Sequence, residues 1–485
     1  MVASHSAAMA LVLARVLVVV TAAQISIEPG GQIVLGAGGG GSGGDCASRE
    51  EVAELRAEMA RHFRLIEAHL GIQSPPASPP APAPQRLFSN YCADVTCGAA
   101  LTAAGWSVVG EFGSMDRFGE GVVASPFNED NGWESGGGTT DTFTASCTDM
   151  SDLYVGGSSV GYVQKPLPQT GGGLTEVVVA FTEPYRNPGN SAGTGCDAII
   201  TDGNGVAMHA YARDVSDVSD GSTTCMSQFS APAPPGTVPP QFVTMLTTTV
   251  DLSNGPGKVR IEEYGSGGNV AAFAYVLTRA APSNGFVPSV YCAASACGRA
   301  AIADGWSVLG EFGSVDRFGQ GTLGKPTSTL PAPWTSSFSN PNGLAPSCVD
   351  LFDFYTSSDA AAYVSVPIAQ TGGTVEVVVA IGNFYDFVQN GGGAPEHGRG
   401  CAAVITDGNG RPATFHARDE SERSSSGTPP CTPQTGDTVP AQLMTTIVTT
   451  VDLTNGAGEV RIEERAKGGA VAYIAYVLTR PVTGQ

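Results

Sequence analysis

The clearest pattern of apolar and polar positions lies near the middle of the chain and returns close to its end. Val243–Leu252 is rich in Thr and Val, and Lys258–Tyr264 and Val270–Thr278 are further runs typical of β-strands. Asn254-Gly255 and a glycine-rich segment separate the three runs. Runs of this kind joined by tight turns predict an antiparallel meander.

A pattern with helical spacing occupies residues 48–73. It begins with a capping box, Ser48 and Glu51. The positions spaced three and four apart are Val52, Leu55, Met59, His62, Ile66 and His69. A short coiled coil that assembles several chains is one interpretation, and a helix packed on its own domain is the other. The proline-rich linker 74–86 favours the coiled coil, and Cys46 is a candidate for an interchain disulfide.

The first 23 residues have the pattern of a secretory signal peptide. Arg15 separates two apolar runs, and Thr21-Ala22-Ala23 supplies small residues for cleavage. An uncleaved anchor is the alternative, but the run is too short to span a bilayer comfortably. Residues 24–47 form a glycine-rich segment that we expect to be flexible. No later segment has the length and apolarity of a membrane span, so we predict a secreted, extracellular protein.

The rest of the chain is a tandem repeat, with copy one at 87–279, a linker at 280–285 and copy two at 286–480. GWSVVGEFGSMDRFG in copy one returns as GWSVLGEFGSVDRFG in copy two, with thirteen of fifteen positions identical. One short helix is expected, around Gly98–Ala104. Otherwise the pattern predicts two homologous β-sandwich domains of jelly-roll type, with a β-barrel as the alternative.

The duplicated motif carries Glu111 and Arg117, which return as Glu311 and Arg317. Alternation along a strand would place Trp106, Val108, Gly110 and Phe112 on one apolar face. Glu111 and Arg117 would then meet across the turn that follows. We interpret this pair as scaffold, whose loss would lower stability slightly.

Composition narrows the class of partner. The formal net charge is −21, and charged residues make up only 14% of the chain. This acidic balance argues against nucleic acid, which requires basic patches. The 64 glycines and 33 prolines suit an all-β protein with many turns.

Each copy carries five cysteines, an odd number, so two bridges within a copy would leave one thiol over. The segments between Cys196 and Cys225 and between Cys401 and Cys431 are among the least similar between the copies. We therefore predict that these two pairs are disulfides that hold variable loops. Zinc is disfavoured, because the cysteines lack CxxC spacing and shared histidines.

Comparison of the two copies tests for shared catalytic residues. His209 aligns with Thr414, and His416 aligns with Tyr211, so no histidine is common to both copies. This argues against a Ser-His-Asp or Cys-His arrangement shared by the copies, and no GxSxG motif is present. Shared carboxylates such as Asp152 and Asp353 leave glycoside hydrolysis open as an alternative.

Two further groups are candidates for binding. The repeated TDGNG segment places Asp202 with Asn204 and Asp407 with Asn409, oxygen ligands that suit calcium, although a hairpin turn explains the same residues.

The second group is aromatic. Trp133 and Trp334 lie in expected loops whose surroundings differ between the copies, and Tyr154 and Tyr355 end a matched segment. These rings could contact a sugar, or the two indoles could fold back and cap the sandwich.

The organisation as a whole favours a secreted oligomeric binding protein for a glycan or another extracellular surface polymer. A cysteine, a coiled coil and repeated heads form a layout similar to that of stalked lectins, and repetition raises avidity. A disulfide-linked component of an extracellular coat or matrix is the first alternative. A polysaccharide-cleaving enzyme that uses the shared carboxylates is the second.

Overall fold

The structure is a computed structural model of the 485-residue chain. It separates into two compact units, Met1–Pro84 and Gln85–Gln485. The residues that it describes are 23–27, 33–37, 90–123, 131–136, 142–145, 147–154, 160–168, 173–185, 195–216, 236–263, 270–282, 286–322, 333–337, 344–354, 362–385, 400–420, 438–464 and 471–482.

Within the first unit, the described residues form one antiparallel hairpin. Strand β1 (Ala23–Ile27) pairs with β2 (Ile33–Ala37). Both strands fall largely within the segment 24–47 that we expected to be flexible, so part of that segment is ordered as a sheet. The predicted coiled coil 48–73, the linker 74–86, Cys46 and nearly all of the predicted signal peptide lie outside the described residues.

The second unit contains both copies, and it is almost entirely β-structure. The elements of copy one are α3 (Val95–Ala103), β3 (Ser107–Glu111), β4 (Glu134–Gly136), β5 (Thr142–Ala145), β6 (Ser151–Tyr154), β7 (Gly161–Leu167), β8 (Leu174–Tyr185), β9 (Cys196–Thr201), β10 (Ala207–Tyr211), β11 (Thr244–Asp251), β12 (Gly257–Glu263) and β13 (Val270–Ala280). The elements of copy two are α4 (Ser295–Ala303), β14 (Ser307–Glu311), β15 (Thr335–Ser336), β16 (Leu344–Cys348), β17 (Leu351–Phe354), β18 (Ala362–Ile368), β19 (Thr374–Tyr385), β20 (Cys401–Thr406), β21 (Pro412–His416), β22 (Thr445–Asp452), β23 (Gly458–Glu464) and β24 (Val471–Pro481).

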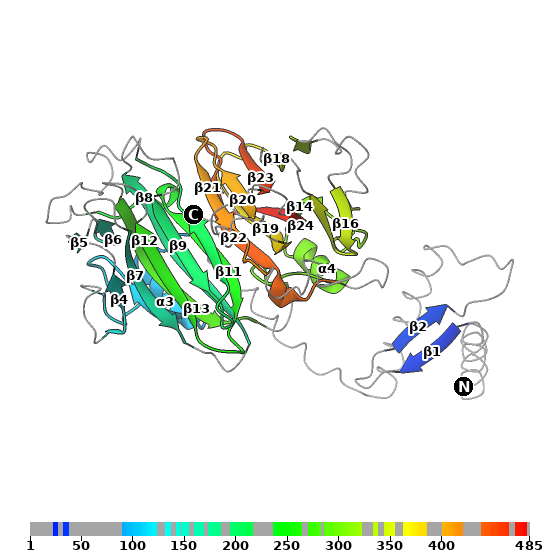
Figure 1. The fold of residues 1–485 in the computed structure, drawn as a ribbon, viewed down its shortest axis with the longest axis horizontal. Coiled ribbons are helices and arrows are strands. Elements are labelled where there is room, and N and C mark those ends of the chain that lie inside the picture. Colours follow the sequence, from blue (N-terminus) through cyan, green and yellow to red (C-terminus); the bar gives the residue numbers. More distant parts are fainter. Residues whose placement is uncertain are drawn as a thin grey trace, which may run out of the picture. The chain divides into compact units, whose positions relative to one another are not determined.

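The strands form two antiparallel sheets that run through both copies (Figure 1). The ten-stranded sheet has the order β15-β18-β23-β20-β21-β10-β9-β12-β7-β4. The twelve-stranded sheet has the order β16-β17-β24-β19-β22-β11-β8-β13-β6-β5, with β14 on β24 and β3 on β13. Each copy is therefore a β-sandwich, as predicted, and its two sheets continue into those of the other copy.

The predicted meander is wrong in its pairing, although its three strands exist. β11 and β13 lie in the twelve-stranded sheet on either side of β8, whereas β12 lies in the ten-stranded sheet between β7 and β9. Successive strands therefore cross between the sheets. A strand that buries one apolar face can pack across a sandwich as readily as it pairs beside its neighbour, so the sequence pattern did not distinguish the two arrangements.

The core has one inner and two outer parts. Between the sheets lies a continuous apolar layer with residues of both copies, for example Val177 and Phe273 with Val377 and Ile474. On the other face of the twelve-stranded sheet, each copy packs its short helix over a separate cluster that contains Trp106 or its counterpart Trp306. The helix predicted at Gly98–Ala104 is thus α3, and Trp106 is a core residue, as expected.

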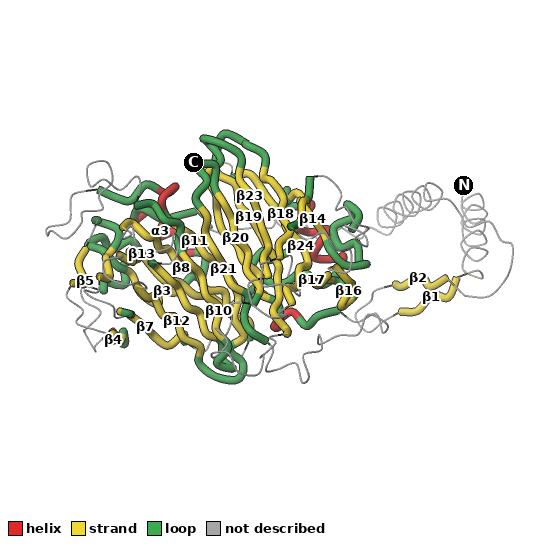
Figure 2. The backbone as a smooth tube through the Cα atoms, turned by 45° about the horizontal axis from the view of Figure 1, so that its top comes forward, coloured by secondary structure: helices red, strands yellow, loops and turns green. Residues whose placement is uncertain are grey.

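The two copies meet edge to edge along two pairs of strands. β10 pairs with β21 (Figure 2). β11 pairs with β22 at Thr247 and Val448. Thr248 Oγ1 donates to Thr446 O at 2.8 Å, and its counterpart Thr449 Oγ1 donates to Met245 O at 2.6 Å. Such reciprocal contacts define a junction with approximate two-fold symmetry inside a single chain.

Two buried arginines close this junction. Arg213 donates to the carbonyls of Val243 and Thr450, and Arg418 donates to Thr249 O at 2.6 Å and Met444 O at 2.8 Å. Each guanidinium thus joins its own copy to the other one. The junction is a packed, hydrogen-bonded interface, which is why the two copies form one compact unit.

A β-bulge changes the predicted faces of the duplicated motif. The register between β3 and β13 shifts, so that Gly110 lies opposite Val276 and Val108 opposite Leu277, with Val109 as the extra residue. Trp106 consequently joins the outer cluster while Phe112 joins the inner core. Copy two has the same shift at Leu309. The expectation that Trp106 and Phe112 share one face is therefore wrong.

Within the described part of the chain, no helix has the length and apolarity needed to cross a membrane.

Candidate functional site

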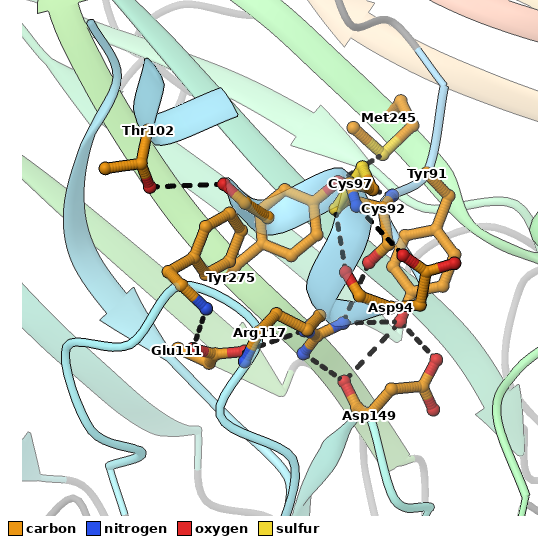
Figure 3. The surroundings of a disulfide bond; sticks show 12 residues. Tyr91, Cys92, Asp94, Cys97, Thr102, Glu111, Arg117, Asp149, Met245 and Tyr275 are labelled. Atoms are coloured by element: carbon orange, nitrogen blue, oxygen red, sulfur yellow. Dashed lines mark hydrogen bonds and ion pairs between the residues drawn. A yellow bond between two sulfur atoms is a disulfide. The ribbon is translucent and has the colours of Figure 1, made fainter. Parts of the chain in front are cut away.

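The duplicated motif forms a buried polar network beneath α3 (Figure 3). Arg117 Nε donates to Glu111 Oε1 at 2.7 Å, and the side chains of both residues are fully buried. The guanidinium also donates to Tyr91 Oη at 3.1 Å and to Asp149 O at 2.6 Å. Tyr91 in turn donates to the Asp149 carboxylate at 2.5 Å. The predicted contact between Glu111 and Arg117 is confirmed.

Copy two repeats this network with the same partners. Arg317 Nε donates to Glu311 Oε1 at 2.9 Å, and its guanidinium donates to Tyr291 Oη at 2.8 Å and to Asp350 O at 2.6 Å. A polar cluster with this many internal hydrogen bonds and no exposure to solvent organises a core.

The electrostatics of the network agree with a structural role. Burial raises the pKa of Tyr91 well above its ordinary value, although Arg117 opposes the shift. Burial would lower the pKa of Arg117, but Tyr91 and Glu111 outweigh it and the pKa is raised. The tyrosine is therefore neutral and the arginine charged at physiological pH. The charged residues of the duplicated motif, Glu111 and Arg117, are therefore hydrogen-bonded to each other within the network.

The cysteines do not pair as predicted. Cys92 is bonded to Cys97 and Cys292 to Cys297, and Cys147 and Cys348 are also disulfide-bonded. Cys225 and Cys431 lie outside the described residues.

The predicted pairs Cys196–Cys225 and Cys401–Cys431 are wrong, because Cys196 and Cys401 are free thiols. Each is the first residue of an inner strand, β9 or β20, and belongs to the fully buried core between the sheets. Burial raises the pKa of both thiols, that of Cys401 to about 12. The unpaired cysteine of each copy is thus enclosed in the core, away from other chains.

The two loop tryptophans are buried. Trp133 is 2% exposed and Trp334 4% exposed, and each packs edge-on against a core phenylalanine, Phe112 or Phe312. Trp334 Nε1 donates to Leu309 O at 2.9 Å. Gly110 makes room for the first indole, since a Cβ there would lie 2.6 Å from Trp133.

This position matches the second interpretation of the tryptophans, in which the indole caps the sandwich. Ligand contact through them stays a prediction. Of the two tyrosines proposed with them, Tyr154 is the last residue of β6, and Tyr355 lies outside the described residues.

The TDGNG segment is the β9–β10 hairpin. Asp202 Oδ1 accepts hydrogen bonds from the backbone of Asn204 at 2.8 Å and Val206 at 3.0 Å, and Gly205 has a φ of +81°. Asp407 and Asn409 repeat the arrangement between β20 and β21. These contacts are those of a side-chain-stabilised turn. In the described residues, no group of three or more His, Cys, Asp or Glu side chains could hold a metal ion.

The carboxylates Asp152 and Asp353 are not brought together. They lie on β6 and β17, which are seven strand steps apart in the twelve-stranded sheet. At about 4.7 Å per step the strands are roughly 33 Å apart. Because they are equivalent residues of the two copies, a glycosidase would need a second carboxylate within each copy, and the enzyme alternative stays a prediction.

A different set of polar and aromatic residues gathers on the outer face of the ten-stranded sheet. In copy one, Tyr162 lies opposite Glu262, and Glu262 lies opposite Asp197. Their strand neighbours Val163, Ile261 and Ala198 point into the inner core, so the three side chains share the outer face. Arg260 lies on the same face, two residues before Glu262 on β12. His209 on β10 also faces outward, since its neighbours Met208 and Ala210 point into the inner core. We call Tyr162, Asp197, His209, Arg260 and Glu262 the copy-one patch.

The copy-one patch is held by charged contacts. The Arg260 guanidinium lies 3.5 Å from the centre of the Tyr162 ring and forms an ion pair with Glu262. His209 Nδ1 lies 2.8 Å from Asp197 Oδ2. The side chains of Arg260 and His209 are 26% and 19% exposed. Burial raises the pKa of Glu262, although Arg260 opposes it, while Asp197 raises it further. The patch is therefore one electrostatic unit, in which the cationic and imidazole side chains are partly exposed and the two carboxylates are nearly buried.

Copy two presents the corresponding triad. Tyr363 lies opposite Glu463, and Arg461 pairs with Glu463 at 2.6 Å and lies 5.2 Å from the Tyr363 ring centre. The Arg461 side chain is 37% exposed. We call Tyr363, Arg461 and Glu463 the copy-two patch. Its sheet neighbours differ from those of copy one, since Ala402 and Thr414 stand where copy one has Asp197 and His209.

At the junction between the copies, the outer faces of their two halves of the ten-stranded sheet become continuous. Tyr211 lies opposite Thr414 in the register, and its ring meets the imidazole of His416 edge-on at 5.5 Å. Tyr211 is 5% and His416 1% exposed, so the middle of this face is closed and separates the two patches.

The patches were not identified from the sequence, because the two copies were compared through their histidines and His209 has no counterpart in copy two. The repeated Tyr, Arg and Glu positions were a usable signal, since TyrVal and ValArgIleGlu recur at the same spacing in both copies.

Comparisons with known proteins give no family. No family model matches the chain, and no curated protein matches it. Among solved structures, the chain is similar to the carbohydrate-binding module TmCBM61, described in complex with β-1,4-galactotriose, at 10% identity and a TM-score of 0.21. That match covers 31% of this chain and 90% of the module.

Two tandem structures align with more of the chain. The CBM22-1–CBM22-2 tandem of Xyn10C from Paenibacillus barcinonensis matches at 11% identity and a TM-score of 0.19, covering 78% of this chain and 98% of that one. The tandem CBM51 modules of a family 98 glycoside hydrolase from Streptococcus pneumoniae match at 11% identity and a TM-score of 0.19, covering 78% and 97%. The strand order and register described above, rather than these likenesses, define the fold.

Proposed function

We propose that this protein is a secreted glycan-binding protein that holds neutral saccharides on the outer face of its ten-stranded sheet. The observation that carries the proposal is the repeated Tyr–Arg–Glu triad at matched positions of that face, with the arginine side chain 26% or 37% exposed and the glutamate nearly buried beneath it.

The chemistry of the triad suits a sugar. A tyrosine ring offers an apolar face with a polar edge, and a saccharide offers C–H faces beside hydroxyl groups. The guanidinium supplies several donors in a fixed plane, and the carboxylate supplies acceptors. A few placed polar groups beside aromatic surface are typical of small-molecule sites.

The charge balance favours neutral over acidic glycans. Each exposed arginine of the patches, Arg260 and Arg461, is already paired with a glutamate. The chain as a whole carries a formal net charge of −21, which repels anionic polymers.

The N-terminal region extends this proposal. A signal peptide at 1–23 would deliver the protein outside the cell, and a coiled coil at 48–73 would assemble several chains into a homo-oligomer. Each chain would then contribute two patches, and avidity would raise the strength of binding to a repetitive polymer. Mass analysis of the secreted protein under non-reducing conditions would measure the cleavage site and the oligomeric state together.

The binding test uses a panel of neutral oligosaccharides on an array and calorimetry on the hits. We expect Tyr162→Ala with Tyr363→Ala to abolish binding, while the wild-type chain binds at least one saccharide. Val95→Ala serves as the control, because Val95 is 56% exposed on α3, away from the ten-stranded sheet. Unchanged binding in the double tyrosine variant would refute the assignment of the patches, and no binding by the wild-type chain would refute the function.

A further inference from the structure

The two patches differ in the residues that flank their shared triad. In copy one, Asp197 lies directly opposite Glu262 in the sheet and binds the imidazole of His209. In copy two, Ala402 lies opposite Glu463, and Thr414 takes the place of the histidine. One patch therefore has a charged, hydrogen-bonded extension that the other lacks.

The pair of Asp197 and His209 that extends the copy-one patch is positioned to make a further hydrogen bond. The Asp197 side chain is 3% exposed, and Asp197 Oδ1 also accepts from the Ala210 backbone at 3.2 Å, so its position is fixed. With Nδ1 of His209 held by Asp197, Nε2 on the other side of the ring is left to make one further hydrogen bond. Nε2 of His209 forms no hydrogen bond with any described residue, and the side chain is 19% exposed.

The two patches are also too far apart to act on one small saccharide. β12 and β23 are separated by five strand steps, roughly 24 Å at about 4.7 Å per step. The closed junction at Tyr211 and His416 lies between them. Each patch therefore meets its ligand independently.

We propose that the copies bind glycans with different selectivity, and that the His209–Asp197 pair makes copy one the more discriminating site. This inference rests on the proposed function. Copy one binds a saccharide hydroxyl through a hydrogen bond with His209 Nε2, whereas copy two relies on the Tyr–Arg–Glu triad alone. A site with an added polar contact rejects a ligand that lacks the matching hydroxyl, because the polar group is left unpaired.

The experiment compares saccharides that differ in one hydroxyl. The probes are gluco- and galacto-configured tetrasaccharides and their singly deoxygenated forms, measured by calorimetry on the full chain. Tyr363→Ala isolates copy one, and Tyr162→Ala isolates copy two. For at least one hydroxyl, we expect copy one to discriminate about tenfold more strongly than copy two, which is the size of one hydrogen bond.

The chain supplies its own matched variants. Asp197→Ala with His209→Thr gives copy one the residues of copy two, and the selectivity should fall to that of copy two. His209→Thr alone is a milder version that leaves the Asp197 contact to the backbone in place. A thermal melt of each variant shows that the fold is retained.

The outcomes separate the two proposals. Loss of the extra discrimination in His209→Thr, with overall binding retained, supports the inference. Equal discrimination by both isolated copies overturns it while leaving glycan binding intact. Failure of the wild-type chain to bind any tetrasaccharide overturns the proposed function itself.

Discussion

The buried network under each helix is the same in both copies, whereas the outer face of the ten-stranded sheet differs between them at one pair of residues. Glu111 and Arg117 reappear in copy two with the same partners at nearly the same distances. On the outer face, the pair of Asp197 and His209 becomes Ala402 and Thr414.

The difference follows from what surrounds each set. A buried ion pair cannot change one member without leaving the other charge unpaired in the core, so the whole set persists. On the outer face, the nearly buried Asp197 and its partner His209 are replaced together, so that no charge is left unpaired. Identity between the copies marks both the buried scaffold and the Tyr–Arg–Glu triad, and the exchange of Asp197 and His209 is where we propose that the copies differ in selectivity.

The largest expected effect is on stability, from breaking the network. Arg117→Met should lower the free energy of unfolding by about 3–5 kcal/mol, because Glu111 is left as an unpaired buried charge. This loss is larger than the slight one expected from the sequence, because both side chains are fully buried. Arg260→Met is the matched control on the outer face, where we expect a loss below about 1 kcal/mol. Equal losses for the two variants, measured by urea unfolding, would remove the distinction between scaffold and patch.

The next effect concerns the junction. Arg213→Met removes the donors to the carbonyls of Val243 and Thr450, and we expect a loss of about 2 kcal/mol. Arg418→Met removes the symmetric contacts and should cost a similar amount. Denaturant unfolding of the two single variants and the double variant measures both losses. If one of the two substitutions left the free energy of unfolding unchanged, the two halves of the junction would contribute unequally to stability despite their symmetric geometry.

The pH dependence of stability tests a residue of the inner sheet face, Glu263, independently of the patches. Burial raises the pKa of Glu263 from 4.5 to about 8, so the folded protein holds this proton more tightly than the unfolded chain. The stabilising contribution of the proton is therefore fully present below pH 4.5 and is lost as pH rises through 8.

Glu263→Gln removes this dependence, and we expect the variant to gain stability over the wild type most strongly at pH 8 and above. Melting temperatures of both proteins between pH 5 and pH 9 test the point. A constant difference across that range would show that Glu263 is ionised in the folded state.

The smallest stability effect is expected on the outer face. Tyr162→Ala loses the contact between its ring and the Arg260 guanidinium, worth about 0.5–1 kcal/mol at a half-exposed site. Thermal melts should therefore change little while saccharide binding to copy one disappears. A large drop in melting temperature would instead place Tyr162 with the scaffold.

Several features were predictable because they are local. The hairpin at Asp202 follows from Asp, Asn and Gly at fixed offsets, and the contact between Glu111 and Arg117 spans six residues of chain. The short helix and the strands after residue 243 follow from their side-chain patterns. Each of these depends on groups that are close in the sequence.

Other features depend on distant partners. The bulge at Val109 arises from its register with β13, and it sends Trp106 and Phe112 into different cores. The burial of Cys196 depends on the packing between the sheets, which a cysteine count does not record.

By itself, the sequence determined that the chain is a duplicated, acidic, all-β protein with a scaffold motif in each copy, because repetition, composition and alternation are properties of the chain alone. Only the folded chain shows that the two copies share continuous sheets, and that Tyr from one strand meets Arg and Glu from the strand beside it to form a patch on one face. Strand order decides both, since a strand's own pattern fixes which side chains face outward but leaves open which strand lies beside it.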